Sequence, residues 1–373
     1  MRSAWDDIGK AYFEQKKYGV AEKYVKRHLN EYPRDAQGWI KYGKILTNTE
    51  QFSCAEKAFL TAISLNDRPD YYLDLQLLYT LTANEEKHSA VVKKLQATIP
   101  DDKRFIFNYA WDKIKAGDTY GGWADLEAGR DLGYFGNCYD DTTEQRLTDV
   151  SQVQGSTVAI IGEGGLGDEI IGARYADVIR KHGGTPILIC CEALHSILGH
   201  LGECRTMKDR GEFDYYTPTL GSVPVFKEIP NEVYLCPKDE YVAKHRIYSD
   251  KLKVGICWHG NTEYEWEQYR SVSKDALFNL ASDEVDVYSL QQDDTDQNLD
   301  SWDDTLGVIA NLDMVVSSCT SVVHAAGAMG KRVLVLVPLA PYYLWTTKED
   351  WYPEVTTMPR TTGNKEITEW ICQ

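Results

Sequence analysis

The chain has 373 residues, of which 43% are hydrophobic and 26% charged, so it is long enough for two or three folded domains and too apolar for a disordered protein. Its net charge of −17 lies almost wholly in residues 131–373, and this acidic balance argues against nucleic acid as the main partner. The longest apolar run, Val333 to Leu339, predicts no transmembrane segment, and the scattered cysteines together with the lack of a secretory signal predict a cytoplasmic protein.

Residues 1–118 carry a repeated helical pattern. Trp5 and Trp39 are 34 residues apart, which is the period of the tetratricopeptide repeat. Small and aromatic residues and a proline come after the two tryptophans: Gly9, Tyr12, Ala21 and Pro33 after the first, and Gly43, Ala55, Phe59 and Ala62 after the second. The segment therefore resembles tetratricopeptide repeats, in which each helix pair needs a neighbour to bury its apolar face.

Two roles fit such a short array. It either forms a groove that binds a protein partner or acts as a brace packed on the next domain. A weaker third unit contains Tyr72, Leu75, Tyr79 and Pro100, and an array of about three units favours the brace. Residues 119–155, rich in Gly, Asp and Thr, are predicted to connect the repeats to the next domain.

A βαβ unit comes after this connection. Residues 156–162 predict a buried strand, the sequence GEGGLGDE a turn, and the next residues a helix that ends at Gly183-Gly184 before a strand at 186–191. Asp168 opens the helix at the carboxyl end of a strand, where parallel sheets place their ligands. It either caps the helix or acts as a general base.

A third interpretation of the same turn is nucleotide binding. Gly162, Gly164 and Gly167 fit the G-x-G-x-x-G pattern of dinucleotide-binding proteins, and Glu192 ends the second strand. This pattern on its own predicts an NAD-dependent oxidoreductase, with a pyrophosphate at the start of the helix.

The C-terminal half predicts a second α/β unit after an extended stretch at 218–237. Apolar runs predict strands at 253–258, 285–290, 314–317 and 331–338, with a helix at 305–312. Thr320 and Ser321 begin one more helix, whose amides and hydroxyls suit a diphosphate. Arg270 and His324 suit the same ligand, although each is equally typical of an ordinary surface ion pair or a satisfied helix residue.

The acidic run at 293–304 lacks the spacing of a calcium or magnesium loop. It predicts a solvated acidic face, and the sequence predicts no metal site.

Five segments in order resemble the ADP-heptose:lipopolysaccharide heptosyltransferase family of glycosyltransferases, in its form fused to tetratricopeptide repeats. They are GEGGLGDEIIGARY, VGICWHGNTEY, RSVSKDALFNL with VYSLQ, TLGVIANLDMVVSS, and TSVVHAAGAMGKRVLVLVP with the later DWYP. The resemblance covers about residues 140–373. It implies a two-lobed GT-B fold, with an acceptor lobe at 156–245 and a nucleotide-sugar lobe at 246–373.

The resemblance also implies the chemistry. Such enzymes need no metal or other cofactor, usually invert the anomeric carbon, and move a sugar from a nucleotide-diphospho-sugar to a glycan, lipid-linked or protein acceptor. Asp168 matches the family's general base, with Gly165 and Gly167 shaping its loop. The donor side is carried over to Trp258, Gly260, Asn261, Arg270, Gln291, Thr320, Ser321 and His324.

The chain departs from the family at Cys319, where relatives have an aspartate, and in the aromatic residues Tyr264–Trp266. The departure leaves three hypotheses: a glycosyltransferase, a non-catalytic scaffold built on a transferase fold, and the NAD-dependent oxidoreductase. Fold alone does not decide among them.

Overall fold

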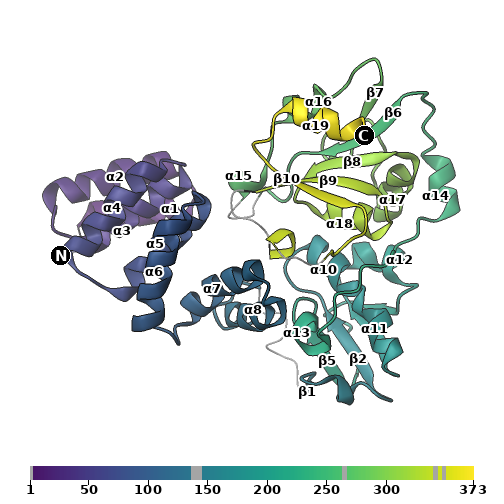
Figure 1. The fold of residues 1–373 in the computed structure, drawn as a ribbon, viewed down its shortest axis with the longest axis horizontal. Helices are drawn as coiled ribbons and strands as arrows, with labels where there is room; N and C mark the ends of the chain where they lie inside the picture. The colour runs from purple at the N-terminus through teal and green to yellow at the C-terminus, as the bar shows by residue number, and fades with distance from the viewer. Residues whose placement is uncertain (1–2, 136–144, 263–266, 339–342, 347–349) are drawn as a thin grey trace. The chain divides into compact units, whose positions relative to one another are not determined.

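The structure, a computed structural model, describes residues 3–135, 145–262, 267–338, 343–346 and 350–373. The chain divides into two compact units, Met1–Tyr109 and Ala110–Gln373. The first unit is all helical and the second is built on two parallel sheets (Figure 1). The aromatic segment 263–266 lies outside the described residues, so its predicted role stays untested.

The first unit consists of antiparallel helices in sequence order. They are α1 (Ala4–Glu14), α2 (Tyr18–Glu31), α3 (Ala36–Asn48), α4 (Phe52–Leu65), α5 (Pro69–Leu81), α6 (Glu85–Thr98) and the start of α7 (Lys103–Ala116). Asp35 and Asn84 cap α3 and α6 by accepting from backbone amides, as residues at this position commonly do. Buried side chains from successive helices form the core of this unit.

One contact of the first unit recurs with the predicted period. A Cβ on Gly9 of α1 would lie 2.8 Å from the side chain of Val25 on α2. A Cβ on Gly43 of α3 would lie 2.3 Å from the ring of Phe59 on α4. Both members of the second pair stand 34 residues after those of the first. The helices of each pair therefore approach through a glycine, which supports a helical repeat; its assignment as tetratricopeptide remains a prediction.

The second unit begins with the end of α7, followed by α8 (Thr119–Leu126) and α9 (Ala128–Asp131), so the segment predicted to connect the two regions carries helices of its own. The first sheet has the strand order β1-β5-β2-β3-β4, and all its pairs are parallel. Its strands are β1 (Gln145–Arg146), β2 (Thr157–Ile161), β3 (Thr185–Ile189), β4 (Glu203–Arg205) and β5 (Tyr215–Pro218). The two predicted strands, β2 and β3, are confirmed at its centre.

Helices alternate with the strands of this first lobe. After β2 the chain forms α10 (Leu166–Ala173) and α11 (Tyr175–Lys181), which the sequence pattern predicts as one helix and which meet at Arg174. The shorter helical segments are η1 (Val150–Gln152), η2 (Glu192–Leu194), α12 (His195–Leu198), α13 (Ser222–Phe226) and α14 (Asp239–Lys244). The stretch at 218–237, predicted to be extended, thus contains one helix.

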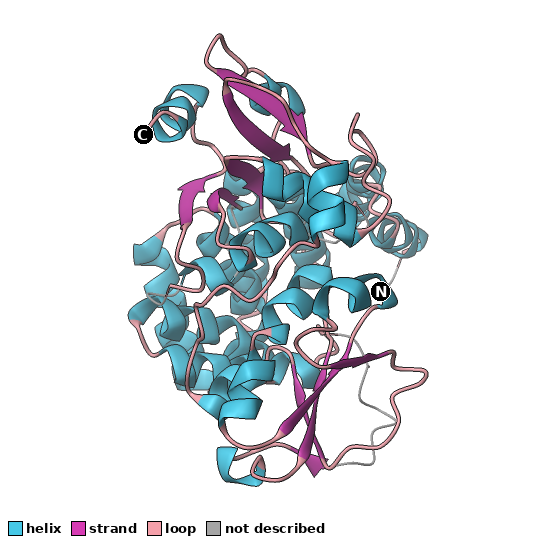
Figure 2. Cartoon of the chain, turned by 90° about the vertical axis from the view of Figure 1, so that its right-hand side faces the viewer, coloured by secondary structure: helices cyan, strands magenta, loops and turns pink. Residues whose placement is uncertain are grey.

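The second sheet has the order β10-β9-β8-β6-β7 and is again parallel throughout; Figure 2 shows the strands as two separate groups. Its strands are β6 (Leu252–Cys257), β7 (Val285–Ser289), β8 (Met314–Ser318), β9 (Arg332–Val337) and β10 (Val355–Pro359). Its helices are α15 (Glu267–Arg270), α16 (Lys274–Phe278), α17 (Trp302–Asn311), α18 (Ser321–Ala328) and α19 (Asn364–Ile371), with η3 at Tyr343–Thr346. The four strands predicted in this half are confirmed.

The acidic run at 293–304 is not wholly a solvated face. Asp303 and Asp304 are buried at the start of α17. Asp304 accepts from Lys244 at 2.6 Å and lies 2.8 Å from Nε2 of His245, and Asp303 pairs with Lys238. The expectation fails there because charge pattern alone does not show that two lysines and a histidine of the preceding segment cover these carboxylates.

A helical N-terminal region together with two parallel five-stranded sheets fits a GT-B-like fold. In such sheets the carboxyl ends of the strands, where loops lead into helices, are the usual ligand edge. The loops after β2, β6 and β8 are therefore where the predicted site residues have to meet.

Candidate active site

The loop after β2 places Asp168 in the first turn of α10. Gly164 turns the chain with φ = +71°, a conformation that side chains other than glycine rarely adopt, and Gly165 then precedes the helix in extended conformation. Oδ2 of Asp168 accepts from the Gly165 amide at 2.8 Å. The capping role predicted for Asp168 is thus present, and its half-buried carboxylate remains partly open to solvent.

The neighbouring Glu169 turns toward the sheet edge. Its Oε2 accepts from the amide of Cys191 at 2.9 Å. A Cβ built on Gly162 would lie 2.5 Å from Oε1 of Glu169. Burial raises the pKa of this carboxyl, and the nearby charge of Asp168 raises it further. Two carboxylates thus surround the glycine-rich turn in which the dinucleotide interpretation expects a pyrophosphate.

A third acid of this loop, Glu163, carries an ion pair that sequence reasoning missed. Its side chain is fully buried and pairs with Arg130 of α9, with Nη2 of Arg130 at 2.8 Å from Oε1. The same Oε1 accepts from the amide of Leu220 after β5. Burial alone would lower the pKa of Arg130, but its bonds to Glu163 and Glu127 raise it above the ordinary value. The segment predicted to connect the domains therefore anchors the loop that carries Asp168.

The two lobes touch through α10 and α18. A Cβ on Gly167 would lie 2.8 Å from Cδ2 of His324 and 3.4 Å from Cα of Ser321. The first turn of α10 therefore lies against the first turn of α18, and the close approach needs a glycine at this position. Three predicted site residues, Gly167, Ser321 and His324, come together here, next to Asp168.

His324 is buried and its Nδ1 is hydrogen-bonded to the Tyr352 hydroxyl over 3.1 Å. Its ring is stacked on Trp345 with centroids 5.5 Å apart and an interplanar angle of 6°. Burial, and then the charges of Arg174 and Arg270, lower the pKa of His324 to about 3. The imidazole is therefore neutral at physiological pH and contributes hydrogen bonding and packing rather than charge.

The first turn of α18 contains no carboxylate. Thr320, at the position before the helix, turns its hydroxyl inward to Ser317 at 3.2 Å and to Cys257 at 3.7 Å, so it does not cap the helix with its side chain. The first amides of a helix have no partner within the helix and carry its positive dipole end. The start of α18 is thus a positive counterpart to the acidic start of α10.

Cys319 lies just before this helix and is buried, with Nε1 of Trp345 donating to its sulfur at 3.1 Å. Burial raises the pKa of the thiol to about 11, against the opposing effects of Trp345 and Arg270, and Asp168 and Glu267 add to the rise. The thiol is therefore uncharged at neutral pH. The charges of Asp168, Arg270 and Glu267 thus all act on this thiol.

Arg270 ends α15 and its guanidinium is paired with Glu267, whose Oε2 accepts from Nε at 2.7 Å. The guanidinium also lies against Gly260, since a Cβ there would come within 2.3 Å of Nη2. The predicted surface ion pair is thus present, but it is buried on the Glu267 side. Glu267 was not singled out from the sequence.

The other predicted donor-side residues lie around the end of β6. Oε1 of Gln291 accepts from the Cys257 thiol and the His259 amide, both at 3.4 Å. Trp258 is buried in the core of the second lobe, with its ring 5.9 Å from that of Phe278, so its side chain supports the loop instead of lining its surface. Asn261 is exposed.

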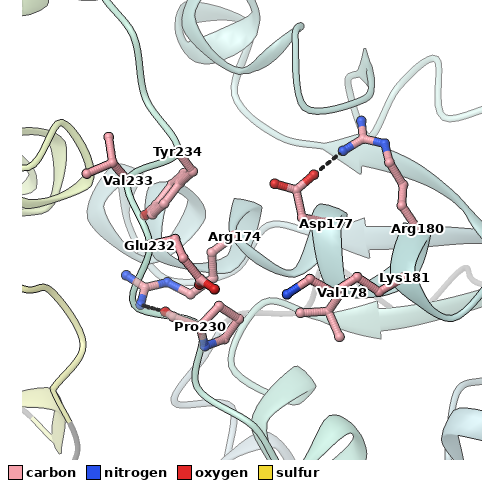
Figure 3. A pocket seen from close by; sticks show the side chains of 9 residues that line it. All are labelled: Arg174, Asp177, Val178, Arg180, Lys181, Pro230, Glu232, Val233 and Tyr234. Carbon is pink, nitrogen blue, oxygen red and sulfur yellow. Dashed lines mark hydrogen bonds and ion pairs between the residues drawn. The ribbon is translucent and has the colours of Figure 1, made fainter.

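A hollow of about 370 Å³ lies elsewhere, between α11 and the segment at 230–234 (Figure 3). Arg174 and Lys181 line it opposite Glu232, and Asp177 and Arg180 are paired with each other at its rim. Arg174 also lies 4.6 Å from the centroid of the Tyr352 ring, and the Tyr352 hydroxyl is hydrogen-bonded to His324, so Arg174 connects this hollow to the start of α18.

Neither a metal centre nor a membrane span is found in the part of the chain that the structure describes. No three His, Cys, Asp or Glu side chains gather in the described ranges as a metal ion would require. Among the described helices, none is both long and apolar enough to span a membrane.

No protein-family model matches the chain, and no curated protein matches it in sequence. Among solved structures it is similar to ADP-heptose LPS heptosyltransferase II of E. coli, with 10% identity over 57% of this chain and 96% of that one and a TM-score of 0.39. It is also similar to the iron-containing dodecameric glycosyltransferase TibC of enterotoxigenic E. coli, with 11% identity over 59% and 65% of the two chains and a TM-score of 0.40. A mutant O-GlcNAc transferase of Thermobaculum terrenum matches over 100% of this chain and 90% of its own, with 11% identity and a TM-score of 0.36.

Proposed function

We propose that the chain is a glycosyltransferase that moves a sugar from a nucleotide-diphospho-sugar to an acceptor hydroxyl. Asp168 is the general base, and the start of α18 together with Arg270 receives the diphosphate. The acceptor is a glycan, a lipid-linked glycan or a protein, and the helical unit is a candidate site for a protein partner. The family resemblance implies that the reaction inverts the anomeric carbon and needs no metal or cofactor.

The observation that carries the proposal is the pairing of two unlike helix starts. At Gly167 the first turn of α10, which holds Asp168 and Glu169, lies against the first turn of α18, which holds no carboxylate. A carboxylate and the positive end of a helix are thus adjacent. Sugar transfer needs this combination, because a proton leaves the acceptor while negative charge develops on the leaving group.

The proposed step is a single displacement. The Asp168 carboxylate takes the proton of the acceptor hydroxyl as its oxygen forms a bond to the anomeric carbon. The bond from that carbon to the diphosphate oxygen breaks, and its electron pair stays on the leaving nucleoside diphosphate. The amides at the start of α18 and the guanidinium of Arg270 stabilise this charge, since both donate hydrogen bonds and carry positive potential.

One observation favours the second candidate, a non-catalytic scaffold. Asp168 already accepts from Gly165, which a merely structural cap would also do. The oxidoreductase candidate is disfavoured, because the Gly165 amide, which a pyrophosphate at the start of α10 would need, already donates to Oδ2 of Asp168.

A thermal-shift screen separates the three candidates. ADP, GDP, UDP, CDP, their sugar conjugates and NAD are each added to the intact protein, since a ligand that binds only the folded state raises the melting temperature. We expect a shift with one nucleoside diphosphate and its sugar conjugate. A shift with NAD alone would support the oxidoreductase, and no shift with any of them would leave the scaffold as the better account.

The Asp168→Asn variant then tests the base. Asparagine keeps the size of the side chain and can still accept from the Gly165 amide, but it cannot take a proton. We expect donor binding to be kept and donor turnover, read as nucleoside diphosphate released by transfer to water, to fall by roughly 10²- to 10⁴-fold. Turnover at the wild-type rate would rule out Asp168 as the base.

A further inference from the structure

Glu267 accepts more hydrogen bonds than a simple ion-pair partner of Arg270 would. Its Oε1 accepts from the amide of Gly260 and from the hydroxyl of Ser271, each at 2.8 Å. Its Oε2 accepts from Nε of Arg270 at 2.7 Å and also from Nη2. One carboxylate, only 8% exposed, thus ties together the loop after β6, the guanidinium and the residue next to it in the chain.

These bonds fix the orientation of the guanidinium. Glu267 takes the edge formed by Nε and Nη2, and a planar guanidinium held along one edge has a defined plane and direction. Gly260 lies beside it, and a Cβ there would come within 2.3 Å of Nη2 and 2.8 Å of Cζ. Arg270 is therefore held between a carboxylate and a glycine backbone, and its side chain is only 21% exposed.

The loop that holds the guanidinium leaves β6 beside the strand that leads into α18. Cys257 at the end of β6 pairs with Ser317 of β8, and the hydroxyl of Thr320, just before α18, donates to the Cys257 sulfur at 3.7 Å. The charge of Arg270 lowers the pKa of three groups there, Cys257, Cys319 and His324, although burial is the largest influence on each of them. Cys257 ends β6, Cys319 precedes α18, and His324 lies in its first turn. An anion bound at the first amides of α18 would therefore be near Arg270.

We propose that Glu267 is the positioning residue of the diphosphate site, holding Arg270 and the Gly260 amide in place beside the start of α18. This inference rests on the proposed function, since it assumes that a diphosphate binds there. The effect expected for a Glu267 substitution is opposite to the effect of its charge. A carboxylate near an anion site weakens anion binding by charge alone. Neutralising Glu267 would therefore improve anion binding, unless its hydrogen bonds position the groups that bind the anion.

The test uses the intact protein and titration calorimetry with inorganic pyrophosphate, ADP, GDP, UDP and CDP as probes. The variants are Glu267→Gln, Glu267→Asp, Arg270→Ala and the double variant Glu267→Gln/Arg270→Ala. The matched control is Asp293→Asn, which removes one negative charge near His259 from a side chain that is 69% exposed. The melting temperature of every variant is measured beside its affinity.

We expect Glu267→Gln to weaken binding on the order of 10-fold, the effect of losing one charge-assisted hydrogen bond. Glu267→Asp keeps the charge but shortens the side chain, so it also weakens binding and serves where the glutamine variant does not fold. Asp293→Asn binds as the wild type does or slightly tighter. The double variant binds no more weakly than Arg270→Ala, because Glu267 acts through Arg270.

Failure of the proposed function and failure of the inference about Glu267 give different results. If the wild-type protein binds none of the five probes, the proposed function falls and this inference with it. If the wild type binds and Glu267→Gln binds equally well or tighter, Glu267 is only a nearby charge and the inference alone is overturned. Losses that multiply in the double variant would also overturn it, since Glu267 would then act independently of Arg270.

Discussion

At the scale of single residues, His324 links stability to pH. Its pKa is lowered to about 3 in the folded protein, first by burial, against an ordinary value of 6.5. Below pH 6.5 the unfolded chain therefore binds a proton that the folded chain does not, so stability falls as the pH falls from 6.5 toward 3. The slope of this contribution is about 1.4 kcal/mol per pH unit.

The His324→Gln variant isolates this contribution. At pH 7 we expect it to be less stable than the wild type, because it loses the stacking on Trp345. The difference in unfolding free energy between the wild type and His324→Gln should narrow by about 1.4 kcal/mol per pH unit as the pH falls from 6 to 5. Urea titrations monitored by tryptophan fluorescence measure this difference. Asp304, whose pKa is lowered from 3.8, acts at lower pH and does not interfere. A difference that stays constant between pH 7 and pH 5 would contradict the buried, neutral imidazole.

At the scale of elements, the close approach of α3 and α4 depends on Gly43. A methyl group there would lie 2.3 Å from the ring of Phe59, which is only 1% exposed and has no room to move without disturbing the core. We expect Gly43→Ala to destabilise the helical unit by about 1–3 kcal/mol, the usual effect of overpacking. Amide hydrogen exchange in peptides from α3 and α4 of the intact chain would report the loss.

Gly19 of α2 provides the matched control, because no atom beyond its chain neighbours and the nearby backbone of its own helix lies within 4 Å of a Cβ built on it. Gly19→Ala should be neutral or stabilising by up to about 1 kcal/mol, since alanine favours the helix more than glycine does. Equal effects of the two substitutions would mean that the helix pair does not depend on a small residue.

The ion pair between α9 and the glycine-rich loop also belongs to this scale. Arg130→Met leaves the fully buried Glu163 without its cation, which typically costs about 3–5 kcal/mol. The double variant Arg130→Met/Glu163→Gln should recover much of that loss, because a neutral amide can still accept from Leu220. Thermal unfolding of the wild type, Arg130→Met and the double variant measures whether their stabilities fall in this order, with the double variant between the other two. A double variant no more stable than the single would show that the loss does not come from the unpaired charge.

The elements also show what the sequence predicts and what it does not. The central strands β2, β6, β8 and β9 are continuous apolar runs, typical of strands covered on both faces. Four strands were missed. The edge strands β1, β4 and β10 are short or largely exposed, and the interior strand β5 has only the four residues YYTP, so none of them has such a pattern.

The same distinction holds for the candidate site. Asp168 and Ser321 are identified by local sequence because each opens a helix after a strand. Glu163 and Glu267 cannot be identified from local sequence, because their roles depend on partners that only folding brings to them. Arg130 is 33 residues from Glu163, and the Gly260 amide is brought to Glu267 by folding of the loop after β6.

At the scale of the whole molecule, several cations of the helical unit are already paired within that unit. Lys41 of α3 pairs with Asp6 of α1, while Lys44 and Arg104 both pair with Asp74 of α5, at 3.2 and 3.6 Å. Asp74 is buried, and burial raises its pKa against the two cations. These ion pairs stabilise the contacts among the helices of this unit, and whether the unit is a brace or a partner-binding groove stays a prediction.

Removal of residues 1–101 tests this role. Every residue proposed to contact donor or acceptor lies in the second unit, so we expect the shortened chain to bind the same nucleoside diphosphate as the intact protein, with the same affinity by calorimetry. If the helical unit is a brace, its removal should still lower the melting temperature of the remaining unit. An unchanged melting temperature would instead favour a partner-binding groove. Lost nucleotide affinity in a folded shortened chain would show that the proposed donor site is incomplete without the helical unit.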